Sequence, residues 1–139
     1  MIGALAELGD PQVRCPTLHV GGTNGKGSVA STLAAVLSAG GIRTGLYTSP
    51  HLCSFRERFQ VNGRPLSEGE LTTSAEKIRD IVLRYGLTFF EAATVLGFHA
   101  LAQEAVAALV VEVGLGGRLD ATNVVQPVVS GVTNVAMDH

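Results

Sequence analysis

The sequence contains no tryptophan, and aromatic side chains make up only 5% of its 139 residues. Cysteine is also scarce, since Cys15 and Cys53 are the two in the chain and their separation matches no metal-binding or redox motif. The chain therefore has no cysteine-based metal site to predict. Two free thiols are typical of the cytoplasm, where we expect the protein.

An excess of charge of one sign is missing too, because 10 basic and 12 acidic residues give a net charge of −2. This balance predicts no basic surface for nucleic acid. No apolar run reaches the roughly 18 residues that a membrane span needs, and the first residues lack the pattern of a signal peptide. We expect neither a nucleic acid nor a membrane as partner.

The residues that are abundant favour an α/β domain, since 46% of the chain is hydrophobic and alanine, valine, leucine and glycine dominate. Apolar runs predict strands at 16–21, 42–47, 109–113 and 128–133, with a loop at 48–57 and an Asn62-Gly63 hairpin. Strands that alternate with helices predict a parallel sheet covered on both faces. Ligands of such sheets bind beyond the carboxyl ends of the strands, here after Val20, Tyr47, Val113 and Thr133.

Helical patterns lie between these strands. Residues 1–8 resemble the end of a helix, and another begins near Ser28 and stops at Gly40. Capping boxes at Ser67 and Thr88 open two more helices, the last reaching about Ala107. The apolar face of the helix after Ser28 is predicted to carry Val29, Leu33, Val36 and Leu37.

The glycine-rich stretch from Gly22 to Ser28 follows a strand and opens a helix, a position where backbone N–H groups bind anions. It departs from the Walker pattern, because Gly27 stands where the hydroxyl residue belongs. Residues 25–30 also match a dinucleotide loop, but no acidic residue ends the next strand. A phosphate loop with Lys26 on the outer phosphates is favoured over a dinucleotide loop and over a plain turn.

Two further strand ends carry polar candidates. Glu112 lies in a buried strand, where a carboxylate is costly unless it is paired or bound to metal. A role on Mg²⁺ or on the attacking group is favoured over a salt bridge to a lysine or arginine. Ser49 follows another strand, and an ordinary turn residue explains it equally well.

Glycines, Arg118 and Asp120 fill the segment from Gly114 to Asn123, which suggests backbone packed against a ligand. Arg118 could bind an anion and Asp120 could anchor the loop, although a structural Arg118–Asp120 pair is an alternative. For residues 88–91, a capping box accounts for Glu91, and phenylalanines are more often core residues. The final His139 carries no information of its own.

Several strings, taken together, resemble one family: 19–28, 48–52, 89–91, 112–123 and 138–139. The chain resembles folylpolyglutamate synthases and bifunctional dihydrofolate synthases of the Mur ligase superfamily. The string from Glu112 to Asn123 is the most specific of them. Mur-type ligases use G-T-x-G-K-x-[ST], which explains the late Ser28, while Gly21 stands where the family usually has alanine.

The resemblance implies a P-loop NTPase-like fold, the Mur ligase central domain, with a mostly parallel sheet and helices on both faces. It implies ATP and Mg²⁺ as cofactors, with Lys26 and Glu112 as catalytic residues. The implied nucleotide-binding residues are Gly22, Thr23, Asn24, Gly25, Lys26, Gly27 and Ser28, and the implied Mg²⁺ ligands are Ser49, Glu112 and His139. The implied substrate-binding residues are Thr88, Phe89, Phe90, Glu91, Arg118, Leu119, Asp120 and Ala121.

The implied reaction joins L-glutamate to a folate or to dihydropteroate. A substrate carboxylate attacks the γ-phosphate of ATP, and the amine of glutamate then attacks the acyl phosphate. Residues 1–139 are expected to be part of the ATP-binding domain, without the C-terminal ligase domain, so this piece alone should be weak or inactive. The full-length protein is expected to be a monomer. The alternatives are a non-catalytic MgATP-binding module and another Mur-type amino-acid ligase.

Overall fold

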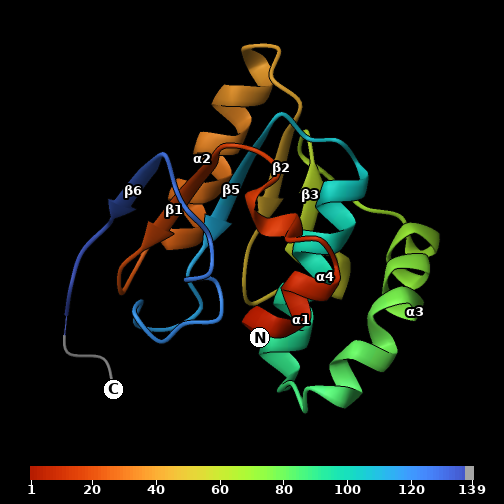
Figure 1. Ribbon diagram of the computed structural model, residues 1–139. Coiled ribbons are helices and arrows are strands. Elements are labelled where there is room, and N and C mark those ends of the chain that lie inside the picture. The colour runs from red at the N-terminus through yellow and green to blue at the C-terminus, as the bar shows by residue number, and fades with distance from the viewer. Residues whose placement is uncertain (137–139) are drawn as a thin grey trace.

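The computed structural model describes residues 1–136, which form a sheet of strands with helices on both of its faces (Figure 1). The strand order is β4-β3-β2-β5-β1-β6. The strands are β1 (Thr17–Gly21), β2 (Thr44–Tyr47), β3 (Phe59–Val61), β4 (Arg64–Pro65), β5 (Ala108–Glu112) and β6 (Val129–Val132). The α/β class and the four main strands predicted from the sequence are confirmed.

The four main strands run parallel, so their carboxyl ends meet at one edge of the sheet. β5 lies between β1 and β2, and β6 flanks β1 on the other side. The register places Val20 of β1 opposite Glu112 of β5. β3 and β4 are antiparallel additions, joined at Asn62 and Gly63, whose φ angles of 49° and 74° fit the predicted hairpin.

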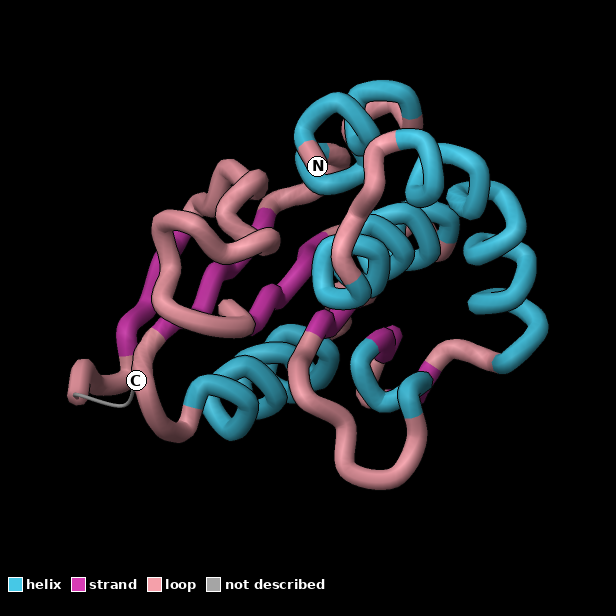
Figure 2. The backbone as a smooth tube through the Cα atoms, turned by 90° about the horizontal axis from the view of Figure 1, so that it is seen from below, coloured by secondary structure: helices cyan, strands magenta, loops and turns pink. Residues whose placement is uncertain are grey.

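The helices form a layer on each side of the sheet (Figure 2). α2 (Lys26–Ala39) packs on one face of the sheet. α1 (Ile2–Glu7) and α4 (Phe89–Gln103) lie on the other face, with α3 (Glu68–Arg84) packed outside α4. None of the helices in residues 1–136 is both long and apolar enough to cross a membrane.

Both predicted capping boxes are present. Ser67 caps α3 with Glu70, and Thr88 caps α4 with Glu91. The predicted end of α4 near Ala107 was wrong, because the helix stops at Gln103 and Ala105 adopts a left-handed φ of 49°. The segment predicted as a loop also contains a third box at Ser54, which opens the short helix η2 (Phe55–Arg58); another short helix, η1, covers Pro11–Val13.

The predicted apolar face of α2 was partly wrong. Val29 and Val36 point outward and are 41% and 64% exposed. Ala30 is completely buried against β1, β2 and β5, with Leu33 and Leu37 packed beside it. Small side chains let a helix approach the sheet closely, so alanine rather than valine lines this interface.

Candidate functional site

The turn between β1 and α2 has the backbone shape of an anion-binding loop. Gly22 has a φ of 125°, and a side chain there would overlap the hydroxyl of Thr133. Gly25 has a φ of 78° and is the N-cap residue of α2. Residues 25–28 thus form the N-cap and first turn, whose N–H groups have no acceptor within the helix. These N–H groups, at the positive end of the helix dipole, are suited to bind phosphate oxygens.

The chain that follows β6 holds this loop in place. The N–H of Thr23 donates to the Asn134 carbonyl oxygen, and the N–H of Asn24 donates to Asn134 Oδ1, both at 2.9 Å. Thr133 Oγ1 donates to the carbonyl oxygen of Asn24 at 2.7 Å. These bonds use the N–H groups at the start of the loop and leave those of the helix turn for a ligand.

Lys26 lies in the first turn of α2 and is half-buried. Its Nζ folds back to donate to the Thr23 carbonyl oxygen at 3.2 Å, so the ammonium group stays over the loop. This places the lysine charge beside the glycine-rich backbone, and its role on the outer phosphates stays a prediction.

Glu112 ends β5 directly beside that loop and is only 5% exposed. Its Oε2 accepts a hydrogen bond from the Ser49 N–H at 3.0 Å. A Cβ built at Gly27 would lie 3.4 Å from both carboxylate oxygens, so the first turn of α2 contacts the carboxylate. Burial raises the pKa of Glu112, while the Ser49 N–H and the charge of Lys26 oppose that rise.

The salt bridge considered for Glu112 is not present, since no ion pair within residues 1–136 includes it. The structure instead brings together Glu112, Ser49 and the phosphate loop, which come from three different strand ends. No cluster of three or more histidine, cysteine or acidic side chains occurs in the described part of the chain. Any cation here would rely on a few protein ligands, and the predicted ligand His139 lies outside the described residues.

Asp120 anchors the loop that follows β5. Its Oδ2 accepts from the Leu115 N–H, and its Oδ1 accepts from the N–H of Thr122, both at 2.9 Å. Thr122 Oγ1 donates to Asp120 Oδ1 and also contacts His19 Nε2 at 2.8 Å. Because the hydroxyl has one proton, His19 Nε2 is the donor in that contact. The anchoring role predicted for Asp120 is confirmed.

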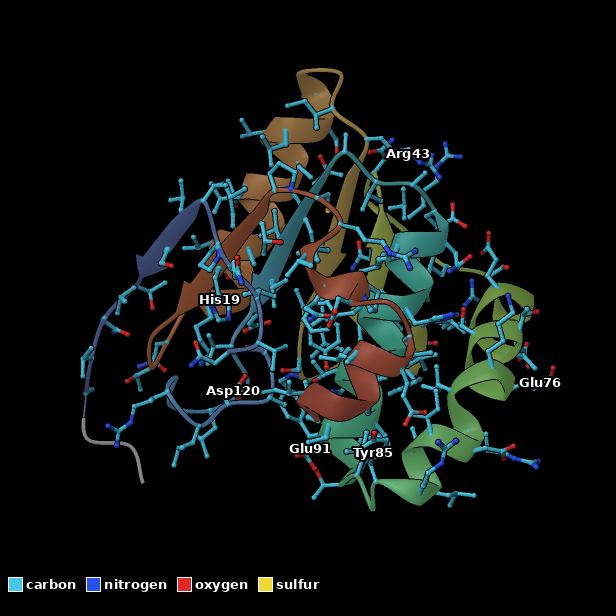
Figure 3. The ribbon with its side chains drawn as sticks, in the orientation of Figure 1. His19, Arg43, Glu76, Tyr85, Glu91 and Asp120 are labelled. Atoms are coloured by element: carbon cyan, nitrogen blue, oxygen red, sulfur yellow. The ribbon has the colours of Figure 1, made fainter. Side chains whose placement is uncertain are left out.

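This hydrogen-bond chain joins the loop after β5 to β1, the strand that leads into the phosphate loop. Figure 3 shows His19 and Asp120 from these two segments near one another. Thr122 is completely buried and His19 nearly so. Burial lowers the pKa of His19, although the charge of Asp120 opposes this, so the neutral donor assigned above is the expected form at neutral pH.

Arg118 does not pair with Asp120, so the alternative of a structural pair was wrong: none of the ion pairs in residues 1–136 includes Arg118. Arg118 instead lines a cleft of about 640 Å³ together with Lys26 and His19. Glycines of β1, β6 and the loop after β5 form much of the wall. Two cations therefore face a cleft bordered by exposed backbone.

Most of the predicted substrate residues lie around a second cavity, of about 880 Å³. It brings Thr88, Phe90 and Glu91 at the start of α4 together with residues 119–121 of the loop after β5, although the two segments are about 30 positions apart in sequence. Glu91 and Asp120 mark the two sides in Figure 3. The predicted residues on this cavity are Thr88, Phe90, Glu91, Leu119, Asp120 and Ala121.

Phe89 lies apart from that cavity and is 69% exposed, beside Phe55 on the outer side of α4. Thr88 and Glu91 also form the helix cap, in which Glu91 Oε2 accepts from the Thr88 N–H at 2.9 Å. These bonds from the backbone and side chain of Thr88 lower the pKa of Glu91. The capping explanation is thus correct, and it leaves open a second role in the cavity.

Sequence reasoning overlooked several residues at this edge. Thr133 and Asn134 hold the phosphate loop, and their only signal was the polar sequence after a strand. His19 was included in a motif but given no role. Arg58 had no signal at all, and a smaller cavity of about 270 Å³ lies between it, Ser49 and Phe90.

No protein-family model matches the chain. The folylpolyglutamate synthase of Lacticaseibacillus casei is 42% identical over 97% of this chain, which covers 33% of that protein. The dihydrofolate synthase/folylpolyglutamate synthase of Escherichia coli is 43% identical over 86% of this chain, covering 28% of that protein. The chain thus spans about a third of the length of the curated relatives it matches.

Comparison with solved structures finds the same similarity. The folylpolyglutamate synthase of Mycobacterium tuberculosis complexed with ADP has a TM-score of 0.95 at 39% identity, covering 98% of this chain and 32% of that one. An FPGS–AMPPCP–folate complex also has a TM-score of 0.95, at 41% identity, covering 99% of this chain and 35% of that one. By sequence and by fold, the chain is therefore similar to folylpolyglutamate and dihydrofolate synthases over a segment about a third as long as they are.

Proposed function

We propose that the protein is an ATP-dependent ligase that adds L-glutamate to a folate or to dihydropteroate, and that residues 1–139 form part of its ATP-binding domain. The observation that carries the proposal is the position of the Glu112 carboxylate between the first turn of α2 and the Ser49 N–H. The relatives' names support the reaction class, and the solved complexes with ADP, AMPPCP and folate support the ligands.

In this proposal residues 22–28 bind the ATP phosphates. Thr23 and Asn24 are already bonded to Asn134, which presets the loop before nucleotide arrives. The N–H groups of residues 25–28 contact phosphate oxygens, and Lys26 reaches the outer ones. Preset donors lower the cost of binding, because little reorganisation is required when the anion arrives.

The donor set fits Mg²⁺. The cation prefers oxygen ligands and usually keeps several waters, so one carboxylate and one hydroxyl are enough from the protein. Glu112 supplies the carboxylate and Ser49 the hydroxyl, at adjoining strand ends. When bound, Mg²⁺ would supply positive charge between the triphosphate and the substrate carboxylate. The buried Glu112, whose pKa is raised, would then gain a counter-charge that favours its ionised form.

The acceptor substrate is proposed to lie in the cavity between residues 88–91 and 119–121. That cavity shares Phe90, Leu115 and Asp120 with the smaller one that reaches Ser49. An extended molecule could therefore place its ring system beside α4 and its carboxylate near Ser49. This would bring the carboxylate to the phosphate loop, as the reaction requires.

In this reaction the residues position the substrates and stabilise the developing charge. The carboxylate oxygen forms a bond to the γ-phosphorus while the bond to ADP breaks. The amine of L-glutamate then attacks the acyl carbon, and inorganic phosphate leaves. Lys26 and the helix N-terminus stabilise the charge that passes to the β–γ bridging oxygen.

The test is ADP release from MgATP, measured with folate and L-glutamate present, with either one omitted, and with other amino acids. Release that requires both substrates supports the ligase. MgATP binding without turnover in the full-length protein would favour the non-catalytic module. Turnover with another amino acid in place of glutamate would favour a different Mur-type ligase.

A further inference from the structure

Arg58 is a buried cation at the junction of η2 and β3. The residue is only 7% exposed, although arginine is rarely buried unless it is paired. Its Nε donates to His51 Nδ1 at 2.9 Å. Its Cζ lies 5.6 Å from the centroid of the Phe55 ring and 5.9 Å from that of Phe89, so two aromatic rings flank the guanidinium. These contacts fix the side chain in place.

The charge of Arg58 has no carboxylate partner in residues 1–136, because no acidic oxygen lies within 4 Å of it. Asp120 borders the same cavity. However, both Asp120 oxygens already accept hydrogen bonds from Leu115 and Thr122 in its own loop. A buried guanidinium without a counter-ion is costly, and such a group is most readily explained by a ligand that supplies the charge.

The cavity of about 270 Å³ beside Arg58 leads to the nucleotide end of the site. It is also lined by Ser49, Pro50, Phe90, Gly114 and Asp120. Ser49 is hydrogen-bonded to Glu112, which contacts the first turn of α2. Arg58 therefore lies between the acceptor cavity and the phosphate loop. With Nε bonded to His51 and a further hydrogen bond from the guanidinium to the Tyr47 hydroxyl, the remaining N–H groups of the terminal nitrogens are the donors left for a ligand.

We propose that Arg58 binds the carboxylate of the acceptor substrate and holds it near Ser49 for phosphorylation. This inference rests on the proposed function and adds a specificity: the acceptor must carry an anionic group at this point. A planar guanidinium forms paired hydrogen bonds with a carboxylate, which lysine does not reproduce. Its charge also offsets the repulsion between the incoming carboxylate and the triphosphate.

The experiment compares two ligands in three variants. The ligands are pteroate and its neutral analogue with methyl in place of the carboxylate, and AMPPCP serves as a nucleotide control. The variants are Arg58→Gln, Arg58→Lys and, as a matched control, Arg64→Gln on the exposed strand β4 of the same hairpin. Equilibrium binding to the chain is measured by titration calorimetry, with thermal melting to check folding.

Arg58→Gln should weaken pteroate binding by about tenfold or more, since hydrogen bonds to charged groups have that effect. The neutral analogue and AMPPCP should change by less than about twofold. Arg58→Lys should restore part of the loss, and Arg64→Gln should change nothing. Equal weakening of both pterin ligands, or no change in either, would overturn the role of Arg58.

Failure of the proposed function gives a different result. In that case the unaltered chain binds AMPPCP but neither pterin compound, so the acceptor site itself is wrong and the role of Arg58 falls with it. The ratio of the two pterin affinities is insensitive to general loosening of the cavity, because loosening affects both ligands alike.

Discussion

Gly22 sits where the backbone of the phosphate loop leaves little room. Its φ of 125° is unfavourable for any other residue, and Thr133 occupies the space of a side chain. The sequence predicted a ligand at this glycine, and the structure adds a packing reason for it: the loop must let the chain after β6 approach closely.

Gly22→Ala should therefore lower the free energy of unfolding by about 1–3 kcal/mol through backbone strain and overlap. Urea unfolding measures the change. Gly69→Ala is the matched control, since a Cβ there meets nothing within 4 Å and helical alanine is favoured over glycine. A Gly22→Ala variant as stable as the parent would contradict the described packing of the loop.

Thr122 joins His19 to Asp120 and is fully buried. Thr122→Val removes the hydroxyl while keeping the shape, so both neighbours lose a partner. We expect a loss of about 1–3 kcal/mol in unfolding free energy. Thr32→Val, on the exposed surface of α2, should change stability by less than about 0.5 kcal/mol. Similar values for the two variants would show that the hydrogen-bond chain contributes nothing.

At the scale of elements, helix starts were the most predictable features, because a capping box is a local pattern that no distant contact needs to complete. Both predicted boxes formed, at Ser67 and Thr88. The face of α2 was less predictable, because Ala30 contributes little to any hydrophobic pattern. Ala30 is buried because the helix approaches the sheet closely, and the sequence of the helix alone does not predict that distance.

Substitutions at two capping residues distinguish an effect on stability from an effect on ligand binding. Ser67→Ala and Thr88→Ala each remove a cap bond and should each cost about 1 kcal/mol of unfolding free energy. Of these two residues, Thr88 lines the cavity proposed for the acceptor, so Thr88→Ala should also weaken folate binding, whereas Ser67→Ala should not. Urea unfolding and folate titration give the two readouts. Equal folate affinities in both variants would leave Thr88 with capping alone.

For the molecule as a whole, His99 on α4 introduces a pH dependence. Burial lowers the pKa of His99, and the charges of Lys77 and Arg14 lower it further. Its Nδ1 is buried without a hydrogen-bond partner in residues 1–136. Below the ordinary histidine pKa of about 6.5, the unfolded chain therefore takes up a proton that the folded chain does not.

The stability that His99 provides is thus present above about pH 6.5 and is lost as the pH falls through the folded pKa. Urea midpoints of the parent chain should drop between pH 7.5 and pH 5.5. His99→Gln should drop less, because His19, whose pKa burial also lowers, is then the main buried histidine left. Parallel curves for the two proteins would contradict the lowered pKa.

Which strand ends meet could be predicted from the sequence, because parallel strands fix the edge where their carboxyl ends lie. Which side chains contact one another at that edge could not be predicted. Asp120 was predicted to anchor its loop, but its link to His19 spans about 100 positions of sequence. Arg58 acquires its position from the packing of η2 against α4, which no local pattern encodes.

The central claim is that the edge formed by the phosphate loop, Ser49 and Glu112 binds a magnesium–nucleotide complex. Titration of the chain with AMPPCP, with and without Mg²⁺, tests it most directly. The account predicts binding that strengthens with Mg²⁺, is lost in Lys26→Ala, and is unchanged in Lys77→Ala on the distant helix α3. AMPPCP affinity unchanged by Lys26→Ala, or no binding in the parent chain, would contradict it.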